Sequence, residues 1–391
     1  MTQREKDALF ILVRYAMGIV KNIPDDEKEN IKSVIPVLYK ESKSHDIAQI
    51  LASALFENNL ISADNEYFEK FKKIQIDSFF REMRMTKDLE EICQAFEEAK
   101  IPFIPLKGSV LRDYYPERWM RTTSDIDVLV KKEDLKRALT LLMEEKGYSY
   151  LTKYSHDVSL VSRNKFHIEI HYDLIEDGLV NKSSDFLSNI WPNTELKPGY
   201  SYWHIMKEEF FYLYHMVHAA KHLLNGGCGI KAFIDLWVLD NKVPHDDQKR
   251  KHIIKKSDVS AFDQMCKELV KVWLEGESYK EEEIVWLEDF VIRGGVYGTP
   301  LNHMAMQQQK LGGKWGYTKK LFFPTYPYMC RHYPILEKHK WLTPAFYVVR
   351  WFHSIFSGNT NRVIKVLETN HSTPKEIDER MIKLLNKMEL R

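Results

Sequence analysis

The sequence predicts an α+β protein, in which a small mixed-sheet core over residues 86–175 lies between two helical regions, 1–85 and 176–391. Apolar residues recur at helical spacing on both sides of this core. Between residues 101 and 171 they instead form short strand-like runs, separated by one amphipathic helix. These two observations together give the predicted fold class.

The N-terminal region, 1–85, is expected to be helical throughout. Leu9, Val13 and Ala16 share one helix face, and Pro24 starts a turn after that helix. A separate helix, rich in Glu and Lys, is expected over residues 86–99 at the start of the core.

Besides the helix over 86–99, the core is expected to contain four strands, a short helix over residues 110–115 that Pro116 stops, and one amphipathic helix. Pro102 and Pro105 make the first strand an edge strand or an irregular one, because proline cannot donate a ladder hydrogen bond. The amphipathic helix is expected over residues 134–146, where Gly147 ends it. The strand-like runs are 101–106, 126–130, 158–161 and 166–171.

The C-terminal region, 176–391, returns to helical periodicity after about residue 200. Helices are expected near 206–224, 230–241, 258–275 and 282–293. Residues 315–356 are crowded with aromatic residues and prolines, and we interpret them as an irregular connection and a helix packed onto the helical domain. An exposed surface that binds a partner is the alternative.

The composition is that of an ordinary globular protein, with 44% hydrophobic and 29% charged residues. Fifty-seven basic residues balance fifty-six acidic ones, so the net charge is +1. This balance gives no support for a long nucleic acid as partner, which would favour a basic chain.

Three further features give the expected location. The four cysteines are far apart and form no C-x-x-C pair, so we expect reduced thiols. The N-terminus lacks the form of a signal peptide, and no apolar run is long enough to cross a bilayer. We therefore expect a cytoplasmic protein with no membrane partner.

Asp125 and Asp127 are the first candidate site residues. They stand two positions apart at the start of a predicted strand, so both carboxylates project from one face while Ile126 and Val128 point into the core. Crowded carboxylates favour a hard divalent cation, Mg²⁺ or Mn²⁺. Two solvated aspartates at a strand end are the alternative.

A glycine-containing turn precedes this strand. Lys107, Gly108 and Ser109 stand where a strand is expected to enter a helix. Free backbone N–H groups at such a turn favour phosphate, and glycine allows the backbone to approach it closely.

Glu169 is the candidate third acid. It lies on the polar face of the run 166–171, between His167 and His171. It either completes the metal site or marks an edge strand with one solvated face.

A histidine-rich helix face is the last candidate. His215, His218 and His222 fall at helical spacing beside Lys221. Structural histidines are the simplest interpretation of this face.

These residues resemble the nucleotidyltransferase superfamily, which has a DNA polymerase beta-like fold, and most closely a bacterial family of uncharacterised nucleotidyltransferases. The matching motifs are Leu106-Lys107-Gly108, Tyr115-Pro116, Arg121, Asp125 to Val130, Glu169 with His171, and the segments 218–222 and 229–236. The gap from Gly108 to Asp125 is longer than is usual in the superfamily, and Tyr172 stands where the family more often has Trp.

The resemblance implies transfer of a nucleoside monophosphate from an NTP such as ATP to an acceptor hydroxyl, with release of pyrophosphate. Asp125, Asp127 and Glu169 would be the catalytic and metal-binding residues. Nucleotide binding would involve Lys107, Gly108, Ser109, Arg121 and Ser124, and the acceptor or phosphate face would include His171, His218, Lys221 and His222.

The acceptor and the base are open at this point, although a small molecule or a protein is favoured over a long nucleic acid. Two alternatives remain. One is a non-catalytic protein that senses nucleotide or binds a partner, and the other is a toxin- or antitoxin-type enzyme that modifies protein or tRNA.

Overall fold

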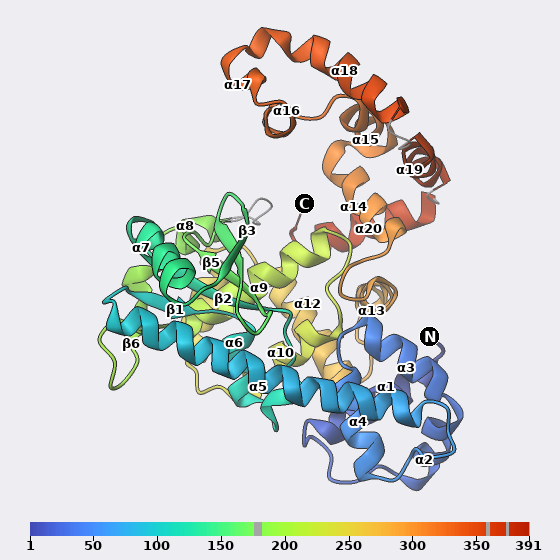
Figure 1. The fold of residues 1–391 in the computed structure, drawn as a ribbon. Helices are drawn as coiled ribbons and strands as arrows, with labels where there is room; N and C mark the ends of the chain where they lie inside the picture. The colour runs from blue at the N-terminus through green and yellow to red at the C-terminus, as the bar shows by residue number, and fades with distance from the viewer. Residues whose placement is uncertain (176–181, 357–359, 373–374, 391) are drawn as a thin grey trace.

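A mixed five-stranded sheet lies among helices, and a helical arm stands away from this body (Figure 1). The computed structural model describes residues 1–175, 182–356, 360–372 and 375–390. The predicted α+β class is confirmed. No helix in these ranges is long and apolar enough to cross a bilayer.

The N-terminal helices lead into one long helix, α5, that runs to the sheet (Figure 1). Thr2 and Glu5 form a capping box that starts the first helix. The separate helix expected over 86–99 is wrong, because it is the C-terminal half of α5, which contains no Gly or Pro to interrupt it. The helices are α1 (Gln3–Ala16), α2 (Asp25–Ser33), α3 (Ile35–Ser44), α4 (Ala48–Glu57) and α5 (Phe68–Glu98).

The sheet has the strand order β1-β2-β5-β4-β3, in which β2 and β5 are parallel and the other pairs are antiparallel. The first strand is at an edge, as its prolines predict. Strand β3 was not predicted from the sequence. The strands are β1 (Phe103–Pro105), β2 (Asp125–Val130), β3 (Ser149–Lys153), β4 (Asp157–Val161) and β5 (His167–His171).

Short helical elements connect these strands. The expected helix over 134–146 is present as α7 continued by the π-helical turn η4, and Gly147 follows it with a φ of 69°. The connecting elements are α6 (Gly108–Leu111), η1 (Arg112–Tyr114), η2 (Arg118–Met120), η3 (Lys132–Asp134), α7 (Leu135–Thr140) and η4 (Leu141–Glu145).

The two faces of the sheet have different roles. Ile126, Val128 and Ile168 are buried against the C-terminal half of α5 and against α7. The opposite face of β2 and β5 carries the polar residues and looks onto a cavity that α9 and α10 also line. The strand alternation predicted from the sequence therefore separates core from site.

The C-terminal domain packs on the N-terminal helices. Phe10 of α1 stacks on Trp273 with ring centroids 4.7 Å apart, and both belong to one core. All four expected helices are present, and α11 is additional. The elements are α8 (Ser183–Leu187), η5 (Trp191–Asn193), β6 (Thr194–Leu196), β7 (His204–Met206), α9 (Glu208–Leu224), α10 (Ile230–Asn241), α11 (Asp247–Lys256), α12 (Ser260–Val270), η6 (Lys271–Glu275) and α13 (Glu282–Gly294).

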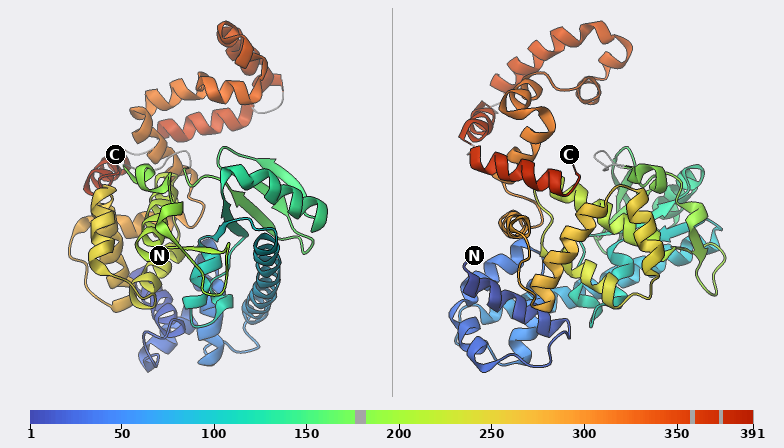
Figure 2. Two further views of the ribbon diagram at one scale, coloured as in Figure 1. Left: turned by 90° about the vertical axis from the view of Figure 1, so that its left-hand side faces the viewer. Right: turned by 180° about the vertical axis from the view of Figure 1, so that it is seen from behind.

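The last helices form the arm and its base, and α15 to α18 extend away from the body in every view (Figures 1 and 2). The expected helix packed onto the helical domain is therefore wrong, because α18 packs instead on α16 and α19. The elements are α14 (Pro300–Leu311), α15 (Gly313–Phe322), α16 (Tyr326–His332), α17 (Ile335–Lys338), η7 (Lys340–Leu342), α18 (Thr343–Phe356), α19 (Thr360–Ser372) and α20 (Lys375–Lys387).

Candidate active site

The parallel strands β2 and β5 place the three candidate carboxylates side by side. Asp125 and Asp127 lie on β2, and Asp127 is the register partner of Glu169 on β5. Because alternate residues of a strand share a face, all three side chains lie on the side of the sheet away from α5. The alternative of an edge strand for Glu169 is wrong, since β5 lies between β2 and β4.

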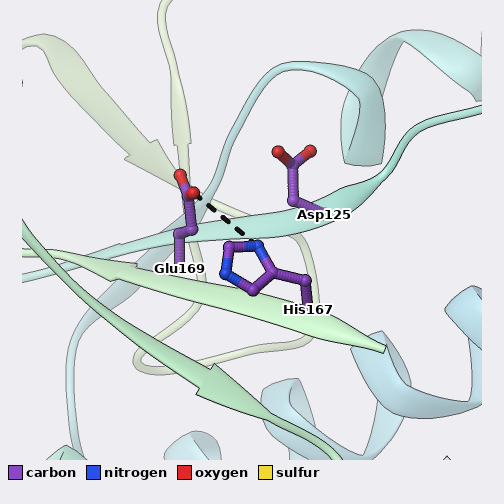
Figure 3. Close-up of side chains that lie close together, drawn as sticks. All are labelled: Asp125, His167 and Glu169. Atoms are coloured by element: carbon purple, nitrogen blue, oxygen red, sulfur yellow. Dashed lines mark ion pairs between the residues drawn. The ribbon is translucent and has the colours of Figure 1, made fainter. Parts of the chain in front are cut away.

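Two overlapping groups of donor atoms arise from this pairing. In the first, Asp125 faces His167 and Glu169, and His167 Nδ1 is 3.7 Å from Glu169 Oε1 (Figure 3). The second contains Asp127, Glu169 and His171. Within each group the donor atoms lie within 4.8 Å of one another. Carboxylate oxygens with a flanking imidazole suit Mg²⁺ or Mn²⁺, so these residues fit a divalent cation.

Asp127 is buried beside the Lys107 ammonium and the His171 imidazole. Its Oδ1 is 3.0 Å from Lys107 Nζ and 2.8 Å from His171 Nε2. Burial alone would raise the pKa of this carboxyl, but Lys107 and His171 hold it well below the usual range. Burial opposes the charged form of His171 too, yet its hydrogen bonds to Asp127 and Glu169 raise its pKa. Asp127 therefore stays ionised.

Lys107 reaches Asp127 from an unusual backbone conformation. Its φ of 47° and ψ of −122° lie in a region that favours glycine. Burial alone would lower the pKa of the Lys107 ammonium, but the nearby carboxylates of Asp127 and Asp125 raise it. The next residue, Gly108, lines the cavity, and a side chain there would meet Arg121 and Thr123.

Ser109 differs from the expectation. Its backbone N–H donates to the Leu106 carbonyl at 3.1 Å, so the predicted free amide at this position is wrong. The tight turn that brings Lys107 to Asp127 uses this amide for its own hydrogen bond. Among the described residues the buried Ser109 Oγ has no hydrogen-bond partner. Ser124 lines the cavity, with its Oγ 3.3 Å from Asp125 Oδ2.

Arg121 is held by Asp235 of α10. Its Nε and Nη2 donate to the two Asp235 oxygens at 2.6 and 2.7 Å, and its Nη1 donates to the Thr122 carbonyl. The Tyr115 hydroxyl donates to the same carboxylate at 2.6 Å. Arg121 lines the cavity, but its guanidinium binds the sheet domain to the helical domain.

The carboxylates open into a cavity of about 690 Å³ between the sheet and the helices. From α9 it is lined by His218, Lys221 and His222, which face the predicted metal-binding strands. Burial lowers the pKa of His222 to about 4 and that of His218 well below its usual value, so both imidazoles are neutral at pH 7. The Nε2 atoms of His218 and His222 are 3.2 Å apart.

His215 is half-buried on the same helix, and its Nε2 is 3.1 Å from the Ala232 carbonyl oxygen. Burial and the Lys107 ammonium lower the pKa of Lys221. Among His218, Lys221 and His222, Lys221 is thus the candidate for contact with an anionic group.

Several lining residues were missed from the sequence. His156 stacks on His171 with ring centroids 5.8 Å apart, and it pairs with the buried Asp157. Lys231 pairs with Asp46 across the same cavity. Single residues on separate elements give no local motif, so only the tertiary structure shows that they meet.

The sequence profile of a family described as "Uncharacterised nucleotidyltransferase" matches residues 34–274, which is more than half of the chain. The chain belongs to this family. The match covers the sheet, both groups of donor atoms and helices α9 and α10, and it ends before the arm. No curated protein and no solved structure gives a significant match. The nucleotidyltransferase family indicates a transferase for nucleoside monophosphate groups, with acidic clusters that could bind a metal ion.

Proposed function

We propose that this protein is a metal-dependent enzyme that transfers a nucleoside monophosphate from an NTP to an acceptor hydroxyl and releases pyrophosphate. The observation that carries the proposal is the meeting of Asp125, Asp127 and Glu169 on two paired parallel strands that line one cavity. The family match supports the reaction class.

Asp125, Asp127 and Glu169 would hold the cation, Mg²⁺ or Mn²⁺, with His167 and His171 beside them. When bound, a divalent cation supplies charge stabilisation to the phosphates and to the attacking oxygen. The three carboxylates give the site the negative charge that such a cation requires.

In the proposed reaction the acceptor oxygen forms a bond to the α-phosphorus of the NTP. The bond from that phosphorus to the bridging oxygen of the β-phosphate breaks, and pyrophosphate leaves. The acceptor's proton passes to Glu169. Asp127 is the poorer base because Lys107 and His171 favour its ionised form, whereas Glu169 is partly exposed to the cavity.

Charge on the triphosphate would be met from both sides of the cavity. Lys107, Gly108 and Ser124 line it beside the carboxylates, and Lys221 lines it from α9. The buried hydroxyl of Ser109, which has no hydrogen-bond partner among the described residues, would be a further donor. Arg121 acts by positioning, because its nitrogens donate to Asp235 and Thr122.

We favour a small molecule or a protein side chain as acceptor. The cavity holds about 690 Å³, which is in the range of small-molecule sites. Its basic residues are interleaved with acids: Lys231 pairs with Asp46, and Lys107 with Asp127. Such a lining does not follow a long phosphate backbone.

A thermal-shift screen of the four NTPs with and without Mg²⁺ tests the proposal, followed by mass spectrometry of candidate acceptors. We expect at least one NTP to stabilise the protein only with the metal, and an acceptor to gain the mass of the corresponding nucleoside monophosphate. Stabilisation without any pyrophosphate release, across all acceptors, would support a nucleotide-sensing protein instead. The absence of any metal-dependent stabilisation would contradict the proposal.

A further inference from the structure

The positive charge of the chain is concentrated in the arm, residues 313–356. This segment contains seven Lys and Arg residues and a single acid, Glu337. The rest of the chain therefore has fifty basic and fifty-five acidic residues. The near-zero net charge is the sum of a basic arm and a slightly acidic body. Such charge asymmetry within one chain is typical of proteins that bind an anionic surface.

The arm also exposes one apolar helix face. Trp341, Ala345, Val348 and Phe352 follow at spacings of four, three and four residues, so they share one side of α18 and its approach. Trp341 is 77% exposed and Phe352 is 56% exposed. In the described part of α18, Pro344 and Val349 are exposed as well, with His353 as the polar exception.

The opposite side of α18 holds the arm together. The Tyr347 hydroxyl donates to the Pro324 carbonyl, and Trp351 Nε1 donates to the Phe322 carbonyl, both at 2.9 Å. Phe346 packs with Tyr333 in a small core. The outward face of the same helix is apolar and stays exposed. An exposed apolar helix face is a candidate contact surface.

We propose that the arm docks this protein onto an anionic lipid bilayer. Exposed Lys338 and Lys340 stand directly before Trp341. Basic residues beside Trp, Phe and aliphatic side chains on a helix suit a surface that offers anionic headgroups above hydrocarbon. Peripheral docking needs no membrane-spanning segment. The expectation of no membrane partner rested on the lack of such a segment, so it does not argue against peripheral docking.

Two other occupants fit the observations less well. A second copy docked face to face would bring two basic arms together, and like charges repel. A nucleic acid would use the basic residues and could stack on Trp341 or Phe352. The side chains between them, Ala345, Val348 and Val349, offer its bases no aromatic plane and no hydrogen bond, whereas they suit hydrocarbon.

The position of the arm is compatible with docking during turnover. It stands away from the body in every view (Figures 1 and 2), and it lies outside the cavity lining and outside the family match. A bilayer contact at the arm would leave the cavity that Asp125, Asp127 and Glu169 line accessible to substrate. The proposal concerns where the protein acts and does not depend on the reaction proposed above.

Co-sedimentation of the full-length protein with lipid vesicles tests the proposal. We expect binding to vesicles of phosphatidylcholine and phosphatidylglycerol, at least about tenfold stronger than to phosphatidylcholine alone, and weakened by salt. Trp341→Ser with Phe352→Ser should reduce this binding about tenfold or more, and so should Lys338→Glu with Lys340→Glu.

Phe80→Ser on α5 is the matched control, because Phe80 is 57% exposed and far along the chain from the arm. It should bind the vesicles as wild type does. All the altered side chains are exposed, so thermal melting should show intact folds. Equal binding to both vesicle types, no binding, or arm variants that bind like wild type would overturn the proposal. It would also be overturned if the arm variants instead lost a dimer in sedimentation velocity, or lost tRNA in filter binding.

Discussion

Lys107 combines a strained backbone with a charge at the centre of the site. Its φ of 47° is unfavourable for any residue with a side chain, yet the conformation brings its ammonium within 3.0 Å of Asp127. Strain of this kind persists where the surrounding structure requires it, often at functional sites. Lysine at this position therefore serves the charge of the site, whereas glycine would suit the backbone of the turn better.

A pair of variants separates these two effects. Lys107→Ala and Lys107→Gly both remove the ammonium, so both should weaken binding of an NTP with Mg²⁺ by a similar factor. Only glycine relieves the backbone, so Lys107→Gly should be more stable than Lys107→Ala by about 1 kcal/mol in urea unfolding. Equal stabilities would show that the backbone is unstrained, and wild-type nucleotide affinity in either variant would exclude a role for the ammonium.

Glu169 is expected to act at the chemical step. Glu169→Gln should lower kcat by about 100-fold or more while KM changes much less, because the proton is accepted in the transition state. The steady-state rate of pyrophosphate release measures both constants. Glu133→Gln, at an exposed position outside the cavity, is the control and should behave as wild type. If kcat is unchanged in Glu169→Gln, the general base lies elsewhere.

At the scale of elements, the sequence predicted the strands of the site but not how they pair. Period-two alternation identified β2 and β5, because each has one buried and one polar face. Their parallel register, which pairs Asp127 with Glu169, joins residues forty-two positions apart and is set by packing around α5 and α7. Arg121 was expected to contact the nucleotide phosphates, but it pairs with Asp235 of α10. A local sequence motif does not show this contact, because the two residues lie far apart in the chain.

The Arg121–Asp235 pair should contribute strongly to stability. The Asp235 side chain is buried and that of Arg121 is only 10% exposed. Arg121→Ala would leave the Asp235 carboxylate with only the Tyr115 hydroxyl among the partners described above. We expect a loss of about 3–5 kcal/mol in the free energy of unfolding. Combining Arg121→Met with Asp235→Leu should recover part of that loss, because no buried charge remains. A loss below about 1 kcal/mol for Arg121→Ala would contradict this role.

His45 should make the interface between α3 and α10 sensitive to acid. Its Nδ1 accepts the Ile230 N–H, and burial lowers its pKa from 6.5 to about 4. The unfolded chain therefore takes up this proton first as the pH falls. The stabilisation is complete above pH 6.5 and is lost between pH 6.5 and 4, by up to about 3 kcal/mol.

Urea unfolding across this pH range measures the effect, with His45→Asn as the comparison because its amide oxygen can still accept a hydrogen bond. The variant should lose less stability than wild type between pH 6.5 and 4. Parallel curves for the two proteins would show that His45 is not the group responsible.

At the scale of the whole molecule, periodicity predicted helices but not the body on which each packs. The helices expected near 206–293 were confirmed, and two of them, α9 and α10, line the cavity together with the sheet. The aromatic residues of 315–356 were expected to be explained by packing on the helical domain, yet several face outward on the arm. The net charge of +1 concealed the basic arm, because composition averages over segments that the fold separates.

The central claim is that β2 and β5 form a metal-dependent nucleotide site in the cavity. Titration calorimetry with Mg²⁺ and the most stabilising NTP tests it on wild type, on Asp125→Asn with Asp127→Asn, and on the control Asp77→Asn, an exposed residue of α5. Wild type and control should bind alike and lose binding in EDTA, whereas the double variant should bind at least about tenfold more weakly with an unchanged circular dichroism spectrum. A correctly folded double variant that binds the NTP and Mg²⁺ with wild-type affinity would contradict the claim.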